Sequence, residues 1–222
     1  MRLEDFFKDI YVQTKIVTVD NQKLVIKCYS SSTSFKWYLI SPSFRNYPYS
    51  SDPEERMNRE LNFFTYRWRE IITPEVIDFD MEQICLYREF LEGEEIRNLD
   101  HFEKLGKALR HIHNEGFVMG DTKLENFITV QGKIAVIDAE QAIISTDISL
   151  RSWDLLVISF STAYTFIKEP LTFGKAIETL FSNYELSKEQ AEELLGIKAI
   201  GLISLIPFLH FSMFRKVVEK YL

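Results

Sequence analysis

Two carboxylates and an amide stand close together in the middle of this 222-residue sequence. Asp121 and Asn126 are five residues apart, and Asp138 follows twelve residues later. Two carboxylates that meet repel each other unless a cation lies between them. Ligands that are all oxygen atoms favour a hard ion. We therefore expect Mg²⁺, together with a phosphate-bearing substrate, where these three side chains meet.

A predicted β-hairpin brings the three side chains together. Two short apolar runs, 127–130 and 134–137, flank a Gln131-Gly132-Lys133 turn. Asn126 directly precedes the first run and Asp138 directly follows the second, so antiparallel pairing places them at neighbouring positions, with Cα atoms roughly 5 Å apart. Asp121 reaches the same end of the hairpin because its loop to Asn126 is short.

The N-terminal part of the chain predicts short strands. Residues 15–19 and 23–28 are rich in β-branched side chains and are joined by Asp20-Asn21, a suitable hairpin turn. Residues 30–51 are rich in Ser, Tyr and Pro and predict a long loop. Two further strands are expected at 75–78 and 83–89.

One helix interrupts these strands. Asp52 is a candidate N-cap, Pro53 takes the first helical position, and Glu55 completes a capping box. Its apolar stripe consists of Met57, Leu61, Phe64 and Trp68. Glu60 lies on the edge of that stripe, so its carboxylate is turned partly toward the core and needs a partner.

The C-terminal part predicts mostly helices. One apolar helix face ends near Gly116, which suits a left-handed C-terminal position, and a strongly apolar helix covers 153–167. Ser187 and Gln190 form a capping box for another helix. The uncharged run 199–214 has 16 residues, too few to span a bilayer, and predicts a buried helical hairpin. Peripheral membrane contact of these helices is the alternative.

Composition narrows the class of protein. Apolar residues make up 46% of the chain, which is typical of a globular protein, and the net charge of −7 argues against a general nucleic-acid binder. Cys28 and Cys85 are too few for a disulfide framework, so we expect a reduced, cytoplasmic setting. The first residues lack the pattern of a signal peptide.

Several segments, in chain order, resemble the protein-kinase superfamily. Residues 120–126 (GDTKLEN) are similar to the catalytic loop H-R-D-L-K-x-x-N, and 138–140 (DAE) stand at the position of D-F-G. Residues 24–27 (LVIK) resemble the strand that carries the ATP lysine, and 89–93 (EFLEG) resemble the hinge. Asp154 resembles the helical aspartate that braces the catalytic loop.

The resemblance implies ATP and Mg²⁺ as cofactors and a role for each matching residue. It implies that Lys27 holds the α- and β-phosphates and pairs with Glu60. Asn126 and Asp138 would bind Mg²⁺. Asp121 would accept the proton of the attacking hydroxyl, and Lys123 would steady the γ-phosphate. Backbone groups of the hinge residues Glu89 and Leu91 would hold the adenine.

The compact plan is similar to the small, atypical branch of RIO kinases, the KEOPS-complex kinase and lipopolysaccharide kinases. Only 15 residues separate Asp138 from Asp154, too few for a full activation loop. The chain also departs from the usual pattern. It has no glycine before Gly93 and hence no Gly-rich loop, Met119 and Gly120 replace His and Arg, and Ala139-Glu140 replaces Phe-Gly.

We therefore predict an α+β, two-lobed, protein-kinase-like fold. Residues 1–90 would form a lobe with an antiparallel sheet and one helix, and 91–222 a mostly helical lobe. The predicted function is transfer of phosphate from Mg-ATP to a protein Ser/Thr hydroxyl. One alternative is a kinase that acts on a small molecule or a lipopolysaccharide-type sugar. The other is a pseudokinase that serves as a binding or scaffold module.

Overall fold

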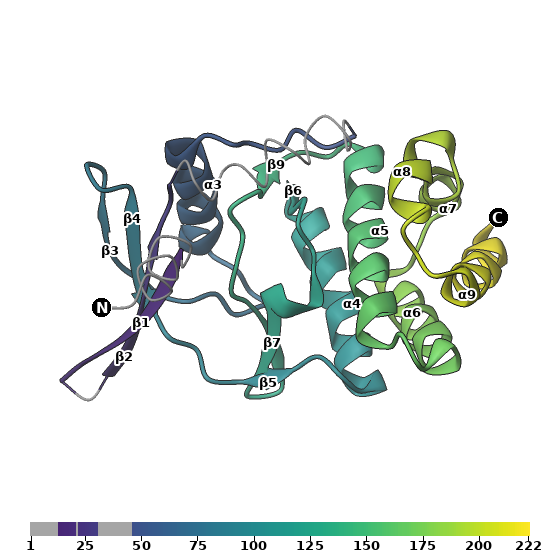
Figure 1. Cartoon of the computed structure of the whole chain (residues 1–222), viewed down its shortest axis with the longest axis horizontal. Coiled ribbons are helices and arrows are strands. Elements are labelled where there is room, and N and C mark those ends of the chain that lie inside the picture. Colours follow the sequence, from purple (N-terminus) through teal and green to yellow (C-terminus); the bar gives the residue numbers. More distant parts are fainter. Residues whose placement is uncertain (1–12, 21, 31–45) are drawn as a thin grey trace, which may run out of the picture.

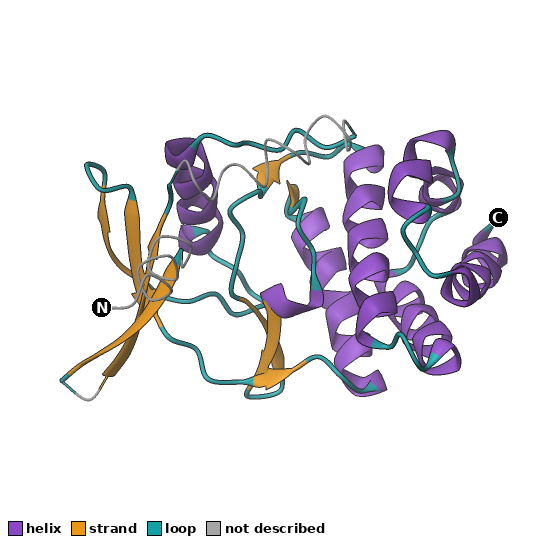
Figure 2. Ribbon diagram, viewed as in Figure 1, coloured by secondary structure: helices purple, strands orange, loops and turns teal. Residues whose placement is uncertain are grey.

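The computed structural model describes residues 13–20, 22–30 and 46–222. The four-stranded sheet lies at one end of the molecule, most helices lie at the other, and the shorter strands lie between them (Figure 2). The N-terminal elements are β1 (Thr14–Val19), β2 (Gln22–Cys28), α3 (Pro53–Thr65), β3 (Val76–Asp80) and β4 (Cys85–Glu89). The middle elements are β5 (Glu94–Glu95), α4 (Leu99–Asn114), β6 (Phe117–Val118), η1 (Leu124–Asn126), β7 (Phe127–Val130), β8 (Lys133–Val136) and β9 (Ile143–Ile144). The chain continues with α5 (Ile148–Thr165), α6 (Pro170–Tyr184), α7 (Lys188–Leu194), η2 (Ile197–Ala199), α8 (Ile200–Ile203), α9 (Phe208–Val218) and η3 (Glu219–Tyr221).

The N-terminal sheet is antiparallel, in the order β1-β2-β4-β3, and α3 packs beside it (Figure 1). Alternation along β2 buries Val25 and Lys27, as expected for a strand with one face turned inward. The structure confirms the predicted strands within two residues at each end. Asp20 has a positive φ of 49° at the β1–β2 turn, whereas Asn21 and residues 31–45 of the predicted loop lie outside the described residues.

A disulfide joins Cys28 and Cys85, and this overturns the expectation of unpaired cysteines. The register of β2 and β4 sets Cys28 directly opposite Cys85, with Cα atoms 4.1 Å apart. The sequence separation of 57 residues hid this pairing, because it depends on a strand register that local patterns do not specify. The cysteines of this structure therefore give no support to the predicted reduced, cytoplasmic setting, which stays a prediction.

Helix α3 begins as its sequence predicts. Asp52 caps it by accepting a hydrogen bond from the Glu55 backbone N–H at 2.8 Å, and Pro53 occupies the first turn. The predicted reciprocal half of the capping box is replaced, because the Glu55 carboxylate instead accepts from the Ser50 hydroxyl at 2.5 Å. Glu60 is not at the edge of the buried face but fully buried (0% exposed).

The helical C-terminal part surrounds α5, which is buried along much of its length. Helix α4 packs against α6, and α6 against α9. Helix α5 begins five residues before the predicted Trp153 start, because the Asp147 side chain caps it through the Ser149 N–H. The Ser187–Gln190 capping box is confirmed at α7. The predicted α+β class, with an N-terminal antiparallel sheet and a helical C-terminal region, is confirmed.

The run 199–214 departs from the predicted buried hairpin. It includes the short α8 and the first part of α9, separated by a break that ends at Pro207. Phe208 is 82% exposed and Leu209 60% exposed, so part of this segment faces outward. Among the described residues, no helix is long and apolar enough to cross a membrane.

Candidate active site

The β7–β8 hairpin positions Asn126 and Asp138. Its turn contains two residues, Gln131 and Gly132, both with positive φ, rather than the predicted three. As a result the Asn126 carbonyl accepts a hydrogen bond from the Ile137 N–H at 2.9 Å, and Asp138 lies one residue beyond this pair. The prediction that both residues meet at the open end of the hairpin holds, with the register shifted by one residue.

The loop before the hairpin carries Asp121 and Lys123. The Lys123 ammonium lies 2.9 Å from the Asp121 carboxylate. The Asn126 side-chain amide donates to the Asp121 carbonyl at 2.6 Å, which ties the two ends of the loop together. Because the Asn126 nitrogen faces this carbonyl, the amide oxygen is the atom that Asn126 can offer to a cation.

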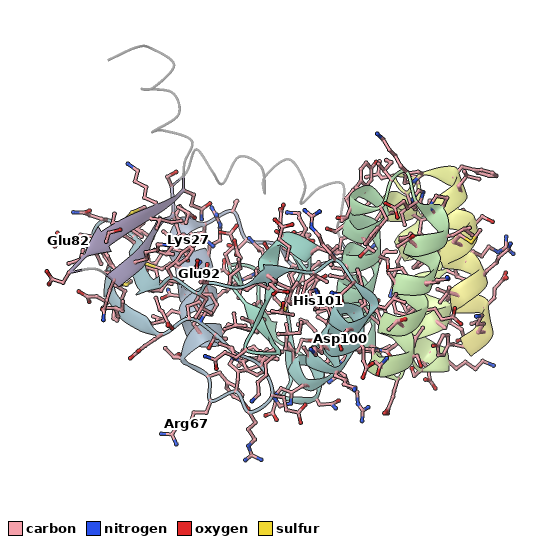
Figure 3. All side chains as sticks on the ribbon, turned by 90° about the horizontal axis from the view of Figure 1, so that it is seen from below. Lys27, Arg67, Glu82, Glu92, Asp100 and His101 are labelled. Atoms are coloured by element: carbon pink, nitrogen blue, oxygen red, sulfur yellow. A yellow bond between two sulfur atoms is a disulfide. The ribbon has the colours of Figure 1, made fainter. Side chains whose placement is uncertain are left out.

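Lys27, labelled in Figure 3, is the centre of a cluster of acidic side chains. Its ammonium lies 2.5 Å from Glu60, 3.0 Å from Asp138 and 3.2 Å from Glu140. The three carboxylates have oxygen atoms within 4.8 Å of one another. The cation that offsets their repulsion in this structure is thus the lysine itself.

Burial and charge perturb this cluster strongly. Although burial alone would lower the pKa of Lys27, the carboxylates of Asp138, Glu60 and Glu140 raise it above its usual range. Burial raises the pKa of Glu60 to about 7, against the attraction of Lys27. Burial acts in the same direction on Glu140, but Lys27 and Arg56 hold the pKa of that carboxyl well below its usual range. Lys27 and the Glu140 carboxylate therefore both stay charged.

Asp154, on α5, holds the backbone at the start of the segment that the sequence predicts to be a catalytic loop. Its carboxylate accepts from the N–H of Met119 at 2.7 Å and from the N–H of Gly120 at 2.6 Å. His113, on α4, lies 3.0 Å from the same carboxylate and 2.7 Å from the Tyr184 hydroxyl. His113 of α4 thus contacts Asp154. The chain has Met119 at the position where the protein-kinase pattern has a His.

Residues 46–52, here called the strap, directly precede α3. They pack on the predicted catalytic loop. The Tyr49 hydroxyl donates to the Gly120 carbonyl at 2.6 Å and accepts from the Trp153 indole N–H at 2.8 Å. The Tyr47 ring lies so close to Gly120 that a Cβ there would fall 2.3 Å from a ring carbon. Gly120 also has a φ of +73°, so any side chain at this position would be strained for two steric reasons.

The predicted hinge follows β4. The Glu89 N–H donates to the Glu75 carbonyl at 2.9 Å, and the Phe90 N–H donates to the Lys23 carbonyl at 3.3 Å. Leu91 lies half-buried between β4 and β5. The Arg88 guanidinium donates to the Ile137 carbonyl at 2.8 Å, which links this strand to the residue before Asp138.

The donor atoms fit the cofactors that the sequence implies. Asp138 is one-third exposed (34% of its side chain) and supplies carboxylate oxygens, and Asn126 supplies an amide oxygen. Such oxygen donors match Mg²⁺. Lys27 is a charged donor beside Asp138, as binding of a nucleotide phosphate requires.

Some residues of this site were missed at the level of sequence. Arg56 binds Glu140 at 2.7 Å, Tyr49 donates a hydrogen bond to the Gly120 carbonyl, and Tyr47 donates one to the Gln141 carbonyl. One signal for Arg56 was available, since it precedes Glu60 by four residues and shares its helix face. No local signal pointed to Tyr47 or Tyr49, whose partners are distant in sequence.

Comparisons with known proteins show the fold. No protein-family model and no curated protein sequence matches this chain. Among solved structures, the choline kinase LicA from Streptococcus pneumoniae aligns over 98% of this chain and 96% of its own, with a TM-score of 0.52 and 12% identity. WaaP, solved in complex with acyl carrier protein, aligns over 94% of this chain and 85% of its own, with a TM-score of 0.48 and 14% identity. The LicA alignment identifies the fold as protein-kinase-like, as predicted.

Proposed function

We propose that this chain binds Mg-ATP and transfers its γ-phosphate to a hydroxyl group. The observation that carries the proposal is the placement of Lys27 between Glu60 and Asp138, at 2.5 and 3.0 Å. A buried lysine that contacts both a helix carboxylate and the carboxylate at the end of a hairpin is the arrangement that phosphoryl transfer needs.

Each residue of the site then has a chemical task. Lys27 binds the α- and β-phosphates, and Glu60 keeps its ammonium in place. Asn126 and Asp138 hold Mg²⁺, which neutralises charge on the phosphates. Backbone groups of Glu89 and Leu91 hold the adenine.

Asp121 acts as the general base. It accepts the proton of the acceptor hydroxyl as that oxygen bonds to the γ-phosphorus and the bond to the departing ADP oxygen breaks. Lys123, 2.9 Å from Asp121, is close enough to stabilise the negative charge that spreads over the γ-phosphate oxygens. The products are a phosphate ester and ADP.

Two features favour a small hydroxyl compound over a protein Ser/Thr as the acceptor. The Asp121 side chain is only 16% exposed, so the acceptor oxygen must reach a recessed carboxylate. The 15 residues between Asp138 and Asp154 include β9, which pairs with β6, and the start of α5. Within the described residues, this stretch leaves no long segment to hold an extended peptide. A protein acceptor is the second candidate.

Nucleotide binding and transfer test the proposal separately. ATP affinity is measured by calorimetry with and without Mg²⁺, and transfer is measured with γ-labelled ATP against small alcohols, amino alcohols, sugars and generic proteins. We expect Mg²⁺-dependent ATP binding that Lys27→Met abolishes. Transfer should fall by about 10²–10⁴-fold in Asp121→Asn, because the base is lost.

A matched control is Asp100→Asn, on the exposed first turn of α4. It should leave both measurements unchanged. ATP binding without transfer to any acceptor would support the pseudokinase alternative. Absence of ATP binding to the wild-type chain would refute the proposal, and transfer that survives in Asp121→Asn would refute the role of the base.

A further inference from the structure

Glu140 occupies an unusual position for a residue with no role in the proposed chemistry. It is buried, and its Oε2 atom lies 3.2 Å from the Lys27 ammonium. Glu140 is therefore a competitor for the same ammonium that is proposed to bind the nucleotide phosphates. A buried carboxylate needs a cation, since leaving it unpaired costs several kcal/mol.

Arg56 provides that second cation. It is completely buried (0% exposed), and its Nη2 atom lies 2.7 Å from the same Oε2 of Glu140, closer than Lys27 does. Gln13 completes the contact, because its amide nitrogen donates to Oε2 at 2.8 Å and its amide oxygen accepts from Arg56 at 3.1 Å. Glu140 is thus held from the side of α3 independently of Lys27.

We propose that Arg56 is a positioning residue that retains Glu140, so that Lys27 is available to the nucleotide phosphates. The inference rests on the proposed function, because it concerns how Lys27 is divided between protein and nucleotide. When the phosphates draw Lys27 toward them, Glu140 keeps a charge-assisted hydrogen bond to Arg56. Without Arg56, release of Lys27 would leave the buried Glu140 carboxylate with neither of these two cations beside it, and nucleotide binding would have to offset that cost.

A suppressor experiment tests this division of labour. ATP dissociation constants are measured by calorimetry for the wild type, Arg56→Met, Glu140→Gln and the double variant, with thermal unfolding of each. We expect Arg56→Met to weaken ATP binding about tenfold. In the double variant, affinity should return to within about threefold of the wild type, because a neutral amide no longer holds Lys27.

A matched control is Arg215→Met, which removes an arginine of α9 from an exposed ion pair with Glu219 of η3 and should not change ATP affinity. A purely structural role for Arg56 would lower stability, and a second substitution at Glu140 would not restore ATP affinity. If Arg56→Met fails to fold, Glu140→Gln alone decides, since it removes the competitor and should bind ATP at least as tightly as the wild type.

The outcomes separate the two claims. Three outcomes would overturn the inference and leave the proposed function intact. Arg56→Met could bind ATP as tightly as the wild type, or the double variant could bind ATP as weakly as Arg56→Met. The third outcome is that Glu140→Gln alone binds ATP more weakly than the wild type. A wild-type chain that binds no ATP would instead refute the proposed function, and the inference with it.

Discussion

Replacing Gly120 by alanine is the sharpest test of how the strap packs on the predicted catalytic loop. A Cβ on this residue would lie 2.3 and 2.4 Å from two carbon atoms of the Tyr47 ring. The ring cannot retreat without cost, because its hydroxyl is bonded to the Gln141 carbonyl at 2.7 Å. Gly120 also has a φ of +73°, where a side chain is strained in any surroundings.

Two independent costs add up in this variant. The left-handed backbone contributes roughly 1–2 kcal/mol. Forcing a methyl group into a filled space adds roughly 1–3 kcal/mol. We therefore expect Gly120→Ala to lower the free energy of unfolding by about 2–5 kcal/mol, and the middle of this range lowers Tm by roughly 10 °C for a chain of this length.

The assay is urea unfolding, with Gly116→Ala as the matched control. Gly116 has a φ of +86°, but a Cβ there meets no atom within 4 Å, so this variant should lose only the backbone term, about 1–2 kcal/mol. In a Tyr47→Ala background, the cost of Gly120→Ala should fall to that same value. Equal costs for Gly120→Ala and Gly116→Ala in the wild-type background would refute the steric reasoning.

Three further predictions concern the core of the site and the sheet. Burial raises the pKa of Glu60 to about 7, so the folded chain retains a proton between pH 4.5 and 7 that the unfolded chain releases. Stability should therefore fall by up to about 3 kcal/mol as pH rises through this window. Glu60→Gln should flatten the slope in unfolding titrations, and an unchanged slope would contradict the shift. Reduction of Cys28–Cys85, which closes a span of 57 residues, should lower stability by up to about 4 kcal/mol in urea unfolding with reductant, whereas equal curves would mean that the cysteines are unpaired in solution. Asp154→Asn should cost about 1–3 kcal/mol and also slow phosphate transfer, and a variant normal in both measurements would show that the loop does not depend on this carboxylate.

The sequence predicted the helix start and the hairpin turn of the site, because nearby residues determine both. The N-cap at Asp52 and the turn at Gly132 mark their elements through nearby residues alone. The hairpin placed Asn126 and Asp138 together because both are defined relative to one turn. Even there, the observed strand register differs from the predicted one by one residue, because the same sequence is compatible with a turn of two residues and with a turn of three.

The contacts that could not be predicted join residues far apart in sequence. Arg56 and Glu140 are 84 positions apart, and Tyr49 and Gly120 are 71 positions apart. Such pairs depend on how α3 and the strap dock on the rest of the chain, which no periodicity encodes. Gly120 itself could be recognised as a departure from the superfamily pattern, but the ring that demands it could not.

The strap also bears on how this molecule could be controlled. The amide of Gln141 makes two hydrogen bonds with the backbone of Ser50, at 2.9 and 3.0 Å, three residues before α3 begins. These bonds anchor the base of α3 to the segment that follows Asp138. An outward movement of α3 that inactivates the site would break these two hydrogen bonds, so they oppose an inactive conformation of that kind.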